Sequence, residues 1–265
     1  MSENGSFETP VLIAEDAIIF PEMEVTIGVR SPKNVAAANQ ALKEHHLVVL
    51  IPRLGPKGAA GSIGTLVLLQ KMVPGGGGAA QLYCKGLWRV QVERVIEDAS
   101  LPRVRFTRAH STDASSGTSA AMETVLGQID EFVRVMPGIP PEIIAYVKSR
   151  DTPGKLADTC AYSPFFTFEE RLDLLRTLDA EQRLRKVSLL FTKQLGELKR
   201  LASVTTIQDC PTCIDLADRA LELEPGSDNV AKEFLDHLVR EHPHEVLALV
   251  AERYGAAFLR RRELK

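Results

Sequence analysis

The sequence predicts an α+β protein with a mixed β-domain at about residues 8–112 and a helical region from about residue 118 onward. Short apolar and alternating runs with a period of two fill the β-domain. A stretch of mostly Ser, Thr, Gly and Asp follows at residues 111–119, which is typical of a linker. After it, apolar residues recur at a period of 3.6, which indicates amphipathic helices.

Strands and turns account for the first domain. Ser31-Pro32 predicts the start of a helix that ends near Glu44, because proline fits the first helical turn. The glycines of Pro74–Gly78 predict the turn of a long hairpin. The expected strands are Val11–Ile13, Ile18–Phe20, Met23–Val29, Leu47–Ile51, Thr65–Val73, Gln81–Val95 and Arg103–Arg108.

Helices account for the rest of the chain. Thr167 and Glu170 have the spacing of a capping box, and a long helix is expected from about Ala180 to Ala202. We place a helical bundle at 118–203 and an additional helical segment at 204–265. Two stripes at helical spacing are expected to be buried: Met122, Val125, Ile129, Phe132 and Met136, and then Leu184, Val187, Phe191, Leu195, Leu198 and Leu201.

Composition favours an ordinary globular protein. The chain of 265 residues is 45% hydrophobic and 25% charged, with a net charge of −3, so no basic excess attracts nucleic acid or a membrane surface. No apolar run approaches the length of a membrane span, and no basic leader precedes an apolar run. The four cysteines are too few for a disulfide framework, so we expect a reduced, cytoplasmic protein.

Four segments, in order over about 190 residues, resemble the N-terminal domain of Lon proteases. Phe20–Met23 resembles the Phe-Pro-x-Met step of that family's first hairpin, and Gly86, Arg89 and Val90 fall in its Gly-x-x-Arg-Val strand. Two helical segments also match, through LADTCA and through LLRTLDAEQRLRKV. The resemblance implies a PUA-like β-domain followed by a helical bundle, and a role in binding substrates or partners. The family's Pro-Leu-Arg is Ile13-Ala14-Glu15 here, and Leu201–Lys265 replaces its coiled region.

The motifs of catalysis are missing from this sequence. A Walker A loop needs G-x-x-x-x-G-K-[ST], but the one Gly-Lys pair, Gly154-Lys155, is followed by Leu156 and lacks the upstream glycine. The resembling family has its Ser–Lys peptidase in a separate domain, and no S-x-x-K occurs here. We therefore expect no enzyme activity and no cofactor.

One cysteine pair has the spacing of a metal or redox site. Cys210 and Cys213 form a CxxC, with His242 and His244 as candidates for further zinc ligands. Their spacing is not that of a standard zinc finger, and the βαβ context of a redox pair is absent. We expect an ordinary helix start, with a zinc- or redox-dependent regulator as an alternative.

The expected function is recognition of unfolded or hydrophobic protein segments, or of a separate partner protein, by an adaptor or regulator. Apolar contacts would lie in a groove between the β-domain and the helices. Trp88, Phe165 and Phe166 are the candidate anchors, and strand parity leaves Trp88 either in the core or, if Gly86 marks a bulge, exposed. The alternative is an RNA-binding module that uses Arg103, Arg105 and Arg108, although no aromatic residue is interleaved with these arginines.

Overall fold

The computed structural model describes residues 5–53, 62–96, 101–110, 119–136 and 139–202, together with Thr212, His237 and Arg240. Contacts divide the chain into two compact units, Met1–Met122 with Arg150–Val187, and Glu123–Ser149 with Ser188–Lys265. The expected division near residues 112–118 is therefore not where the contacts divide. Two short helices lie within Arg150–Val187, after the expected linker, and they belong to the same unit as the strands.

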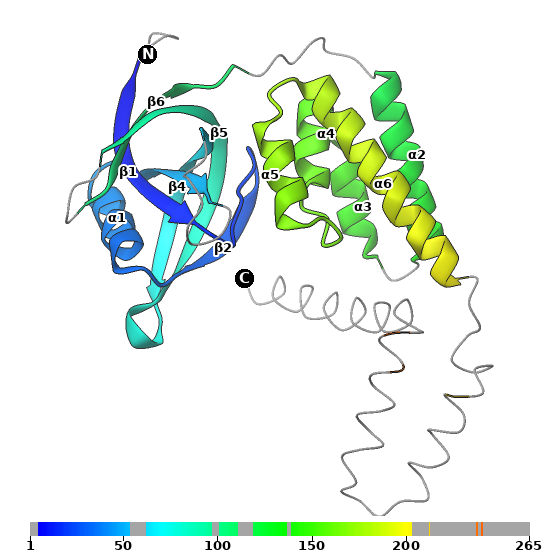
Figure 1. Ribbon diagram of the computed structural model, residues 1–265, viewed down its shortest axis with the longest axis horizontal. Helices are drawn as coiled ribbons and strands as arrows, with labels where there is room; N and C mark the ends of the chain where they lie inside the picture. The colour runs from blue at the N-terminus through cyan, green and yellow to red at the C-terminus, as the bar shows by residue number, and fades with distance from the viewer. Residues whose placement is uncertain are drawn as a thin grey trace, which may run out of the picture. The chain divides into compact units, whose positions relative to one another are not determined.

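The first unit is built on a six-stranded sheet that closes on itself (Figure 1). The strand order is β2-β5-β4-β3-β1-β6, and an additional pairing of β5 with β6 closes β5, β4, β3, β1 and β6 into a ring of five strands. β2 lies outside this ring and, among the described strands, pairs with β5 alone. β1 and β3 are parallel, and every other pair is antiparallel. The strands are β1 Phe7–Ala14, β2 Glu24–Val29, β3 Leu47–Pro52, β4 Ile63–Pro74, β5 Ala80–Ile96 and β6 Arg103–Arg108.

A single long strand, β5, holds the ring together. It has 17 residues, pairs with β2 along its first part and with β6 along its second, and curves visibly between them (Figure 1). The expected hairpin of β4 and β5 is confirmed, with the short 3-10 helix Gly76–Gly78 at its turn. The hairpin implied for the first two strands is wrong, because β2 pairs with β5 whereas β1 pairs with β3 and β6.

Alternation along the strands separates two apolar clusters. In β3, Val48 and Leu50 belong to one cluster, and Val49 and Ile51 belong to the other. The second cluster draws on all five ring strands, as expected for side chains that point into a closed ring. Its buried members are Val11, Val49, Ile51, Leu66, Val90, Val104 and Phe106.

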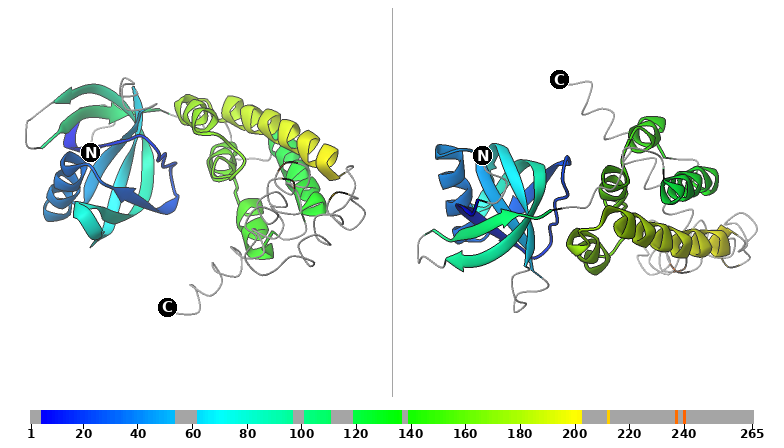
Figure 2. Two further views of the ribbon diagram at one scale, coloured as in Figure 1. Left: turned by 60° about the horizontal axis from the view of Figure 1, so that its bottom comes forward. Right: turned by 90° about the horizontal axis from the view of Figure 1, so that it is seen from above.

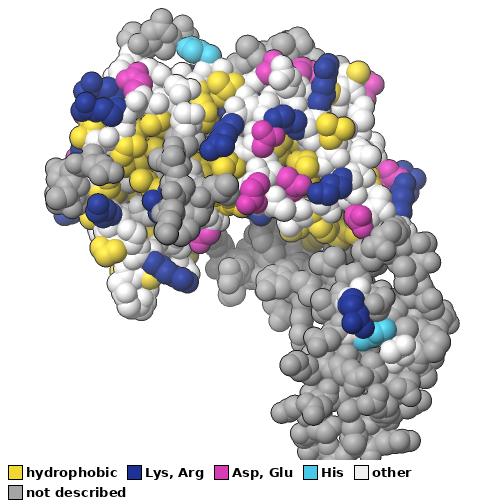
Figure 3. Space-filling view, viewed as in Figure 1, with side chains coloured by type: hydrophobic (Ala, Val, Ile, Leu, Met, Phe, Trp, Pro, Cys, Tyr) yellow, Lys and Arg dark blue, Asp and Glu magenta, His cyan; other side chains and the backbone are white. Residues whose placement is uncertain are grey.

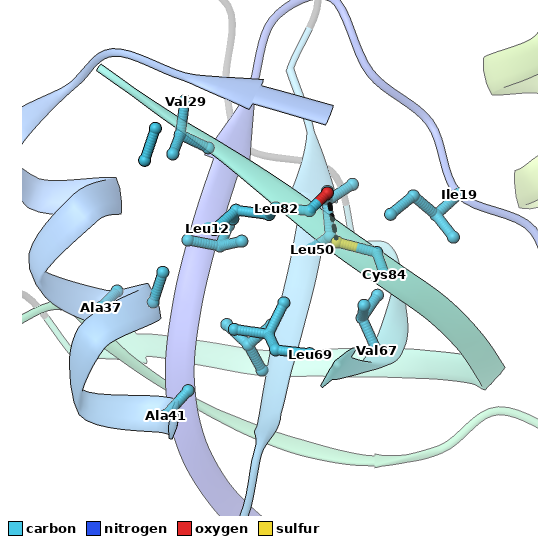
Figure 4. Packing of buried hydrophobic residues seen from close by; sticks show 13 residues of the cluster. Leu12, Ile19, Val29, Ala37, Ala41, Leu50, Val67, Leu69, Leu82 and Cys84 are labelled. Carbon is cyan, nitrogen blue, oxygen red and sulfur yellow. Dashed lines mark hydrogen bonds between the residues drawn. The ribbon is translucent and has the colours of Figure 1, made fainter. Parts of the chain in front are cut away.

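Helix α1 (Pro32–Lys43) covers the other face of the strands. Its buried residues are the small Ala37, Ala38 and Ala41, which allow the helix backbone to approach the sheet closely. Figure 4 shows Ala37 and Ala41 directed at the strand residues of this cluster. The proline at the first turn is consistent with the expected helix start.

The segment Ile18–Phe20 corrects one expectation, because it is buried but is not a strand. The carbonyls of Ile18 and Ile19 accept from side-chain hydroxyls, and the Phe20 carbonyl accepts from the amide of Met23 at 3.4 Å, instead of from a neighbouring strand. Thr65 Oγ1 donates to the Ile19 carbonyl at 2.5 Å, and the Tyr162 hydroxyl donates to the Ile18 carbonyl at 3.2 Å. The apolar run was correctly predicted to be buried, but its hydrogen bonds are not those of a sheet.

Two short helices complete the first unit together with the start of a long one. Helix α4 (Pro153–Cys160) is capped by Thr152, whose side chain accepts from the backbone amide of Lys155. Helix α5 (Phe168–Arg176) has the expected capping box of Thr167 and Glu170, with both hydrogen bonds present. Helix α6 spans Ala180–Ala202, as the sequence predicted, and its residues up to Val187 belong to this unit.

The second unit contains α2 (Ala120–Val135) from Glu123 onward, α3 (Pro141–Lys148) and the remainder of α6, all visible in Figure 2. The stripe expected along α2 is buried, and that of α6 is buried from Leu184 to Leu198. Phe132 of α2 meets Phe191 of α6 edge to face, with ring centroids 5.0 Å apart.

Within the described part of the chain, no helix combines the length and the apolar character that a membrane span requires. The additional segment expected at 204–265 lies outside the described residues, except for Thr212, His237 and Arg240.

Candidate functional site

A cavity of about 660 Å³ opens in the first unit, where the end of the ring meets α4 and the start of α6. Its wall combines apolar side chains of the strands with charged side chains of the strands, the loop before β2 and the helices. Figure 3 shows hydrophobic side chains exposed over the strands, and acidic and basic side chains interspersed on the face in view. The apolar part of the lining is Phe7, Pro21, Leu47, Leu66, Leu87, Trp88, Phe106 and Ala109.

Trp88 is half-buried and belongs to both the core and the cavity. It packs against the ring cluster, and it also lines the cavity wall. The guanidinium carbon of Arg108 lies 5.1 Å from the centre of its ring, within the range of a cation–π contact. Strand parity left Trp88 either in the core or exposed. The structure combines the two alternatives, because one side of the indole contacts the core and another side lines the cavity.

A bulge in β5 gives Trp88 this position. Leu66 pairs with Trp88, but Val67 pairs with Gly86, so Leu87 has no partner in the register. An extra residue changes which face the following side chains occupy. The glycine was the sequence signal for this irregularity.

Gly86 is also the contact point for the loop that carries the Phe-Pro-Glu-Met step. The amide of Glu22 donates to the Gly86 carbonyl, and the amide of Gly86 donates to the Met23 carbonyl, each at 2.9 Å. A Cβ atom at Gly86 would lie 2.1 Å from the carbonyl oxygen of Phe20. Glycine is therefore required here for close approach of two backbone segments, and the loop places Pro21 and Glu22 at the cavity.

A buried charge cluster forms the other wall of the cavity. Arg89 of β5 donates from Nη1 and Nη2 to the two carboxylate oxygens of Asp158 in α4, at 2.7 and 2.6 Å. Arg183 of α6 places Nε 2.9 Å from the same carboxylate. The side chains of the three residues are 3%, 7% and 1% exposed, and all three line the cavity.

Backbone carbonyls accept further hydrogen bonds from both arginines. Arg89 Nε donates to the Leu175 carbonyl at 2.9 Å. Arg183 Nη1 donates to the carbonyls of Thr177 and Leu178 at 2.6 and 3.2 Å. The cluster therefore ties the ring to α4, to the end of α5 and to the start of α6. A buried bidentate pair of this kind is costly to break, by about 3–5 kcal/mol when one partner is removed.

This cluster was not predicted from the sequence, although each member lies in a segment that carries the resemblance. Arg89 stands in the Gly-x-x-Arg-Val strand, Asp158 follows Leu-Ala, and Arg183 precedes Leu184. A charged residue among apolar ones was the available signal, because such a residue is rarely buried without a partner.

The other candidate anchors do not line this cavity. Phe166 is 2% exposed and is among the largest fully buried side chains, so its proposed contact with a partner is corrected to a role in the core. Phe165 is half-buried and is not part of the cavity lining.

The arginines of β6 are engaged on the protein's own surface. Arg105 pairs with Glu8 at 2.5 Å, and Arg103 pairs with Glu44 at 3.5 Å. Arg108 stacks on Trp88. The three do not form a row of uncommitted cations along the strand, so no feature of the described residues favours the nucleic-acid alternative.

The proposed metal ligands Cys210, Cys213, His242 and His244 lie outside the described residues. Among the residues that the structure does describe, no cluster of three or more His, Cys, Asp or Glu side chains could hold a metal ion. Cys84 and Cys160 are free, and burial raises the pKa of each thiol to about 12.

The fold is that of the N-terminal domain of Lon proteases. The structure of the "N terminal domain of Mycobacterium avium complex Lon protease" matches with a TM-score of 0.59 and 23% identity, over 70% of this chain and 98% of that one. The Lon N-terminal domain protein from Xanthomonas campestris matches with a TM-score of 0.52 and 15% identity, over 68% and 96% of the two chains.

The chain belongs to the family of the ATP-dependent protease La (LON) substrate-binding domain, whose model matches residues 8–193. Lon protease of Chloroflexus aggregans is 31% identical over 257 residues, covering 88% of this chain and 30% of that protein. Lon protease of Phenylobacterium zucineum is 32% identical over 215 residues, covering 76% and 27%. The chain thus spans less than a third of the length of these relatives, and the match is to their substrate-binding domain.

Proposed function

We propose that this chain binds unfolded or hydrophobic protein segments and catalyses no reaction itself, so that it acts as an adaptor or regulator. The observation that carries the proposal is the cavity beside Trp88, in a domain whose family is defined by substrate binding. Its volume of about 660 Å³ falls in the usual range of ligand sites. A cavity of this size accepts one large side chain and its neighbours.

The cavity supplies the two components of a specific protein contact. Trp88, Phe7 and Phe106 offer apolar surface, and removal of water from such surface provides most of the binding free energy. Charged groups at the cavity, among them Glu22 and Lys155, orient the segment without requiring a particular sequence. Phe165, outside the cavity, remains a separate prediction from the sequence.

Fluorescence offers a direct test, because Trp88 is the only tryptophan in the chain. We expect a reduced, carboxymethylated client that contains no tryptophan to shift the emission of the intact protein in a saturable way. The native, unmodified form of the same client protein should leave the emission unchanged. A saturable interaction seen by calorimetry with no change in Trp88 emission would place binding elsewhere.

The absence of catalysis has its own test. Lys155, the lysine of the one Gly-Lys pair, lies in the first turn of α4, where its amide donates to Thr152 Oγ1 as part of the helix cap. We expect the purified chain neither to hydrolyse ATP nor to degrade casein. ATP turnover above background that disappears in Lys155→Ala would contradict the non-enzymatic interpretation.

A further inference from the structure

We propose that the free edge of β2 (Glu24–Val29) binds an extended segment of a client polypeptide, which adds to the sheet as a further strand. The inference rests on the proposed function and deepens it, because it names the backbone of the client as the group that this edge recognises. It also assigns a second contact, apart from the cavity beside Trp88, to the same class of client.

β2 is paired on one side only within the described part of the chain. It pairs with β5, and no other described strand lies along its second edge. Helix α1, which follows β2 in the chain, has its main strand contacts with β1, β3 and β4. Gly28 is exposed, and because glycine has no side chain, this exposure is that of the strand backbone itself. The edge is therefore open to another chain.

The register shows which backbone groups point to the free edge. The amide of Gly86 donates to the Met23 carbonyl at 2.9 Å, so these two residues form a hydrogen-bonded pair of the β2–β5 ladder. Successive residues of an antiparallel strand direct their amides and carbonyls to opposite sides. The residues that face β5 are therefore Val25, Ile27 and Val29. The residues that present N–H and C=O groups at the free edge are Glu24, Thr26 and Gly28.

The chemistry of this edge fits an extended polypeptide. A row of alternating backbone donors and acceptors is complementary to the backbone of another strand. β2 contains neither the lysine nor the proline that commonly protects an edge strand from such pairing. Val25 and Ile27 are partly buried and pack on the cluster beneath α1. A partner strand with an apolar side chain at every second residue would extend this apolar face.

Position and size favour a client segment over a second copy of this chain. Pro21 and Glu22 line the cavity and lead into β2, so the free edge begins at the rim of the site that we assign to clients. Two copies of β2 joined edge to edge would contribute six residues each. Such a contact falls well short of the roughly 1,000 Å² that a stable interface buries. Backbone hydrogen bonds also require no particular sequence, which suits the recognition of unfolded chains.

N-methylated peptides test the inference on the intact protein. A fluorescently labelled peptide of about nine residues alternates valine with threonine, and two derivatives are methylated on the valine amides or on the threonine amides. Because these two sets of amides point to opposite edges of a strand, only one set can donate to β2. We expect one derivative to bind about tenfold or more weakly by fluorescence anisotropy, and the other to bind within about twofold of the parent peptide. Equal affinities of the two derivatives would overturn the inference.

Thr26→Pro tests the same edge from the side of the protein. Proline at this position removes an N–H that faces away from β5, so the ladder with β5 keeps its hydrogen bonds, and edge strands tolerate such a proline. Thr26→Ala loses the same hydroxyl but keeps the amide, and it is the reference. We expect Thr26→Pro to bind the labelled peptide and the unfolded client about tenfold more weakly than Thr26→Ala does. Equal affinities would overturn the inference. Thermal unfolding checks that both variants fold, and the methylated peptides decide if Thr26→Pro does not.

The outcomes separate this inference from the function on which it rests. If Thr26→Pro and Thr26→Ala bind the unfolded client equally while Trp88→Ala binds it more weakly, the edge inference fails and the proposed function stands. If the parent protein binds neither the client nor the peptides, both fail. A parent protein that sediments as a dimer under the conditions of the binding experiments, with Thr26→Pro as a monomer, would assign the edge to a second copy of the chain. That result would also overturn the inference.

Discussion

Arg89 and Asp158, separated by 69 residues in the sequence, form a buried bidentate pair with N–O distances of 2.7 and 2.6 Å. The pair joins β5 to α4, and it lies in the wall of the cavity that we assign to client binding. The same side chains therefore fix the helices against the ring and set the charge of the site. Stability and recognition are expected to depend on them together.

Loss of the shared carboxylate should destabilise the fold. In Asp158→Asn two buried guanidinium groups lose the carboxylate that both contact, and we expect the free energy of unfolding to fall by about 3–5 kcal/mol. Asp151→Asn is the matched control, because Asp151 is 71% exposed and its ion pair with Lys155 is on the surface. Urea denaturation of both variants checks the prediction. Equal losses in the free energy of unfolding would show that the buried cluster contributes no more to stability than a surface ion pair does.

Close backbone contact at Gly86 gives a second prediction. Gly86→Ala places a methyl group 2.1 Å from the Phe20 carbonyl oxygen, so either the loop or β5 must move, and we expect a loss of several kcal/mol. Gly28→Ala, in β2, is the control because no atom lies within 4 Å of the added Cβ. Thermal unfolding distinguishes the two. A melting temperature for Gly86→Ala equal to that of Gly28→Ala would mean that the loop is not held there.

Local patterns in the sequence predicted the helices well, because capping and helical periodicity act over a few residues. The Thr167–Glu170 capping box and the bounds of α6 are examples. Partners of the strands could not be predicted in the same way. Ile18–Phe20 has the composition of a strand, but the carbonyls of Ile18 and Ile19 accept from the hydroxyls of Tyr162 and Thr65, which are far away in the sequence.

The candidate site shows the same limit of local reasoning. Trp88 was identified because a lone tryptophan in a strand is conspicuous, and Gly86 signalled the bulge beside it. The charge cluster was missed, because Arg89, Asp158 and Arg183 come from β5, α4 and α6, and each alone resembles an ordinary surface charge in the sequence. Only the closed fold brings them together.

Two thiols should be chemically inert in the folded protein. Burial raises the pKa of Cys84 and Cys160 from 9.0 to about 12, so at about pH 8 neither forms the reactive thiolate. We expect iodoacetamide to leave both unlabelled in the native protein and to label both in concentrated guanidinium chloride, as located by mass spectrometry. Rapid native labelling of Cys160 would contradict its burial.

The raised pKa values of the two thiols also determine how the free energy of unfolding changes with pH. Between pH 9.0 and about 12 the folded state keeps thiol protons that the unfolded state loses, so the free energy of unfolding falls as the pH rises through this window. A Cys84→Ala Cys160→Ala double variant should show a shallower fall in urea denaturation experiments at successive pH values. An identical slope would exclude the two thiols as its source.

The two aromatic candidates should respond differently to truncation. Phe166→Ala removes a fully buried ring, and we expect a loss of about 3–5 kcal/mol in the free energy of unfolding. Trp88→Ala removes a half-buried ring whose other side lines the cavity, so its loss should be smaller, about 1–2 kcal/mol. Urea denaturation of both variants tests the order, and a larger loss for Trp88→Ala would assign it mainly to the core.

The affinity of Trp88→Ala for an unfolded client, measured by calorimetry, tests the central claim most directly. Tyr83→Ala is the control, because Tyr83 is an exposed aromatic residue of the same strand that does not line the cavity. An anchor truncated to alanine loses about 2 kcal/mol or more, so we expect Trp88→Ala to bind about 30-fold more weakly while Tyr83→Ala binds like the parent. Parental affinity in a folded Trp88→Ala protein would contradict the assignment of the cavity as the client site.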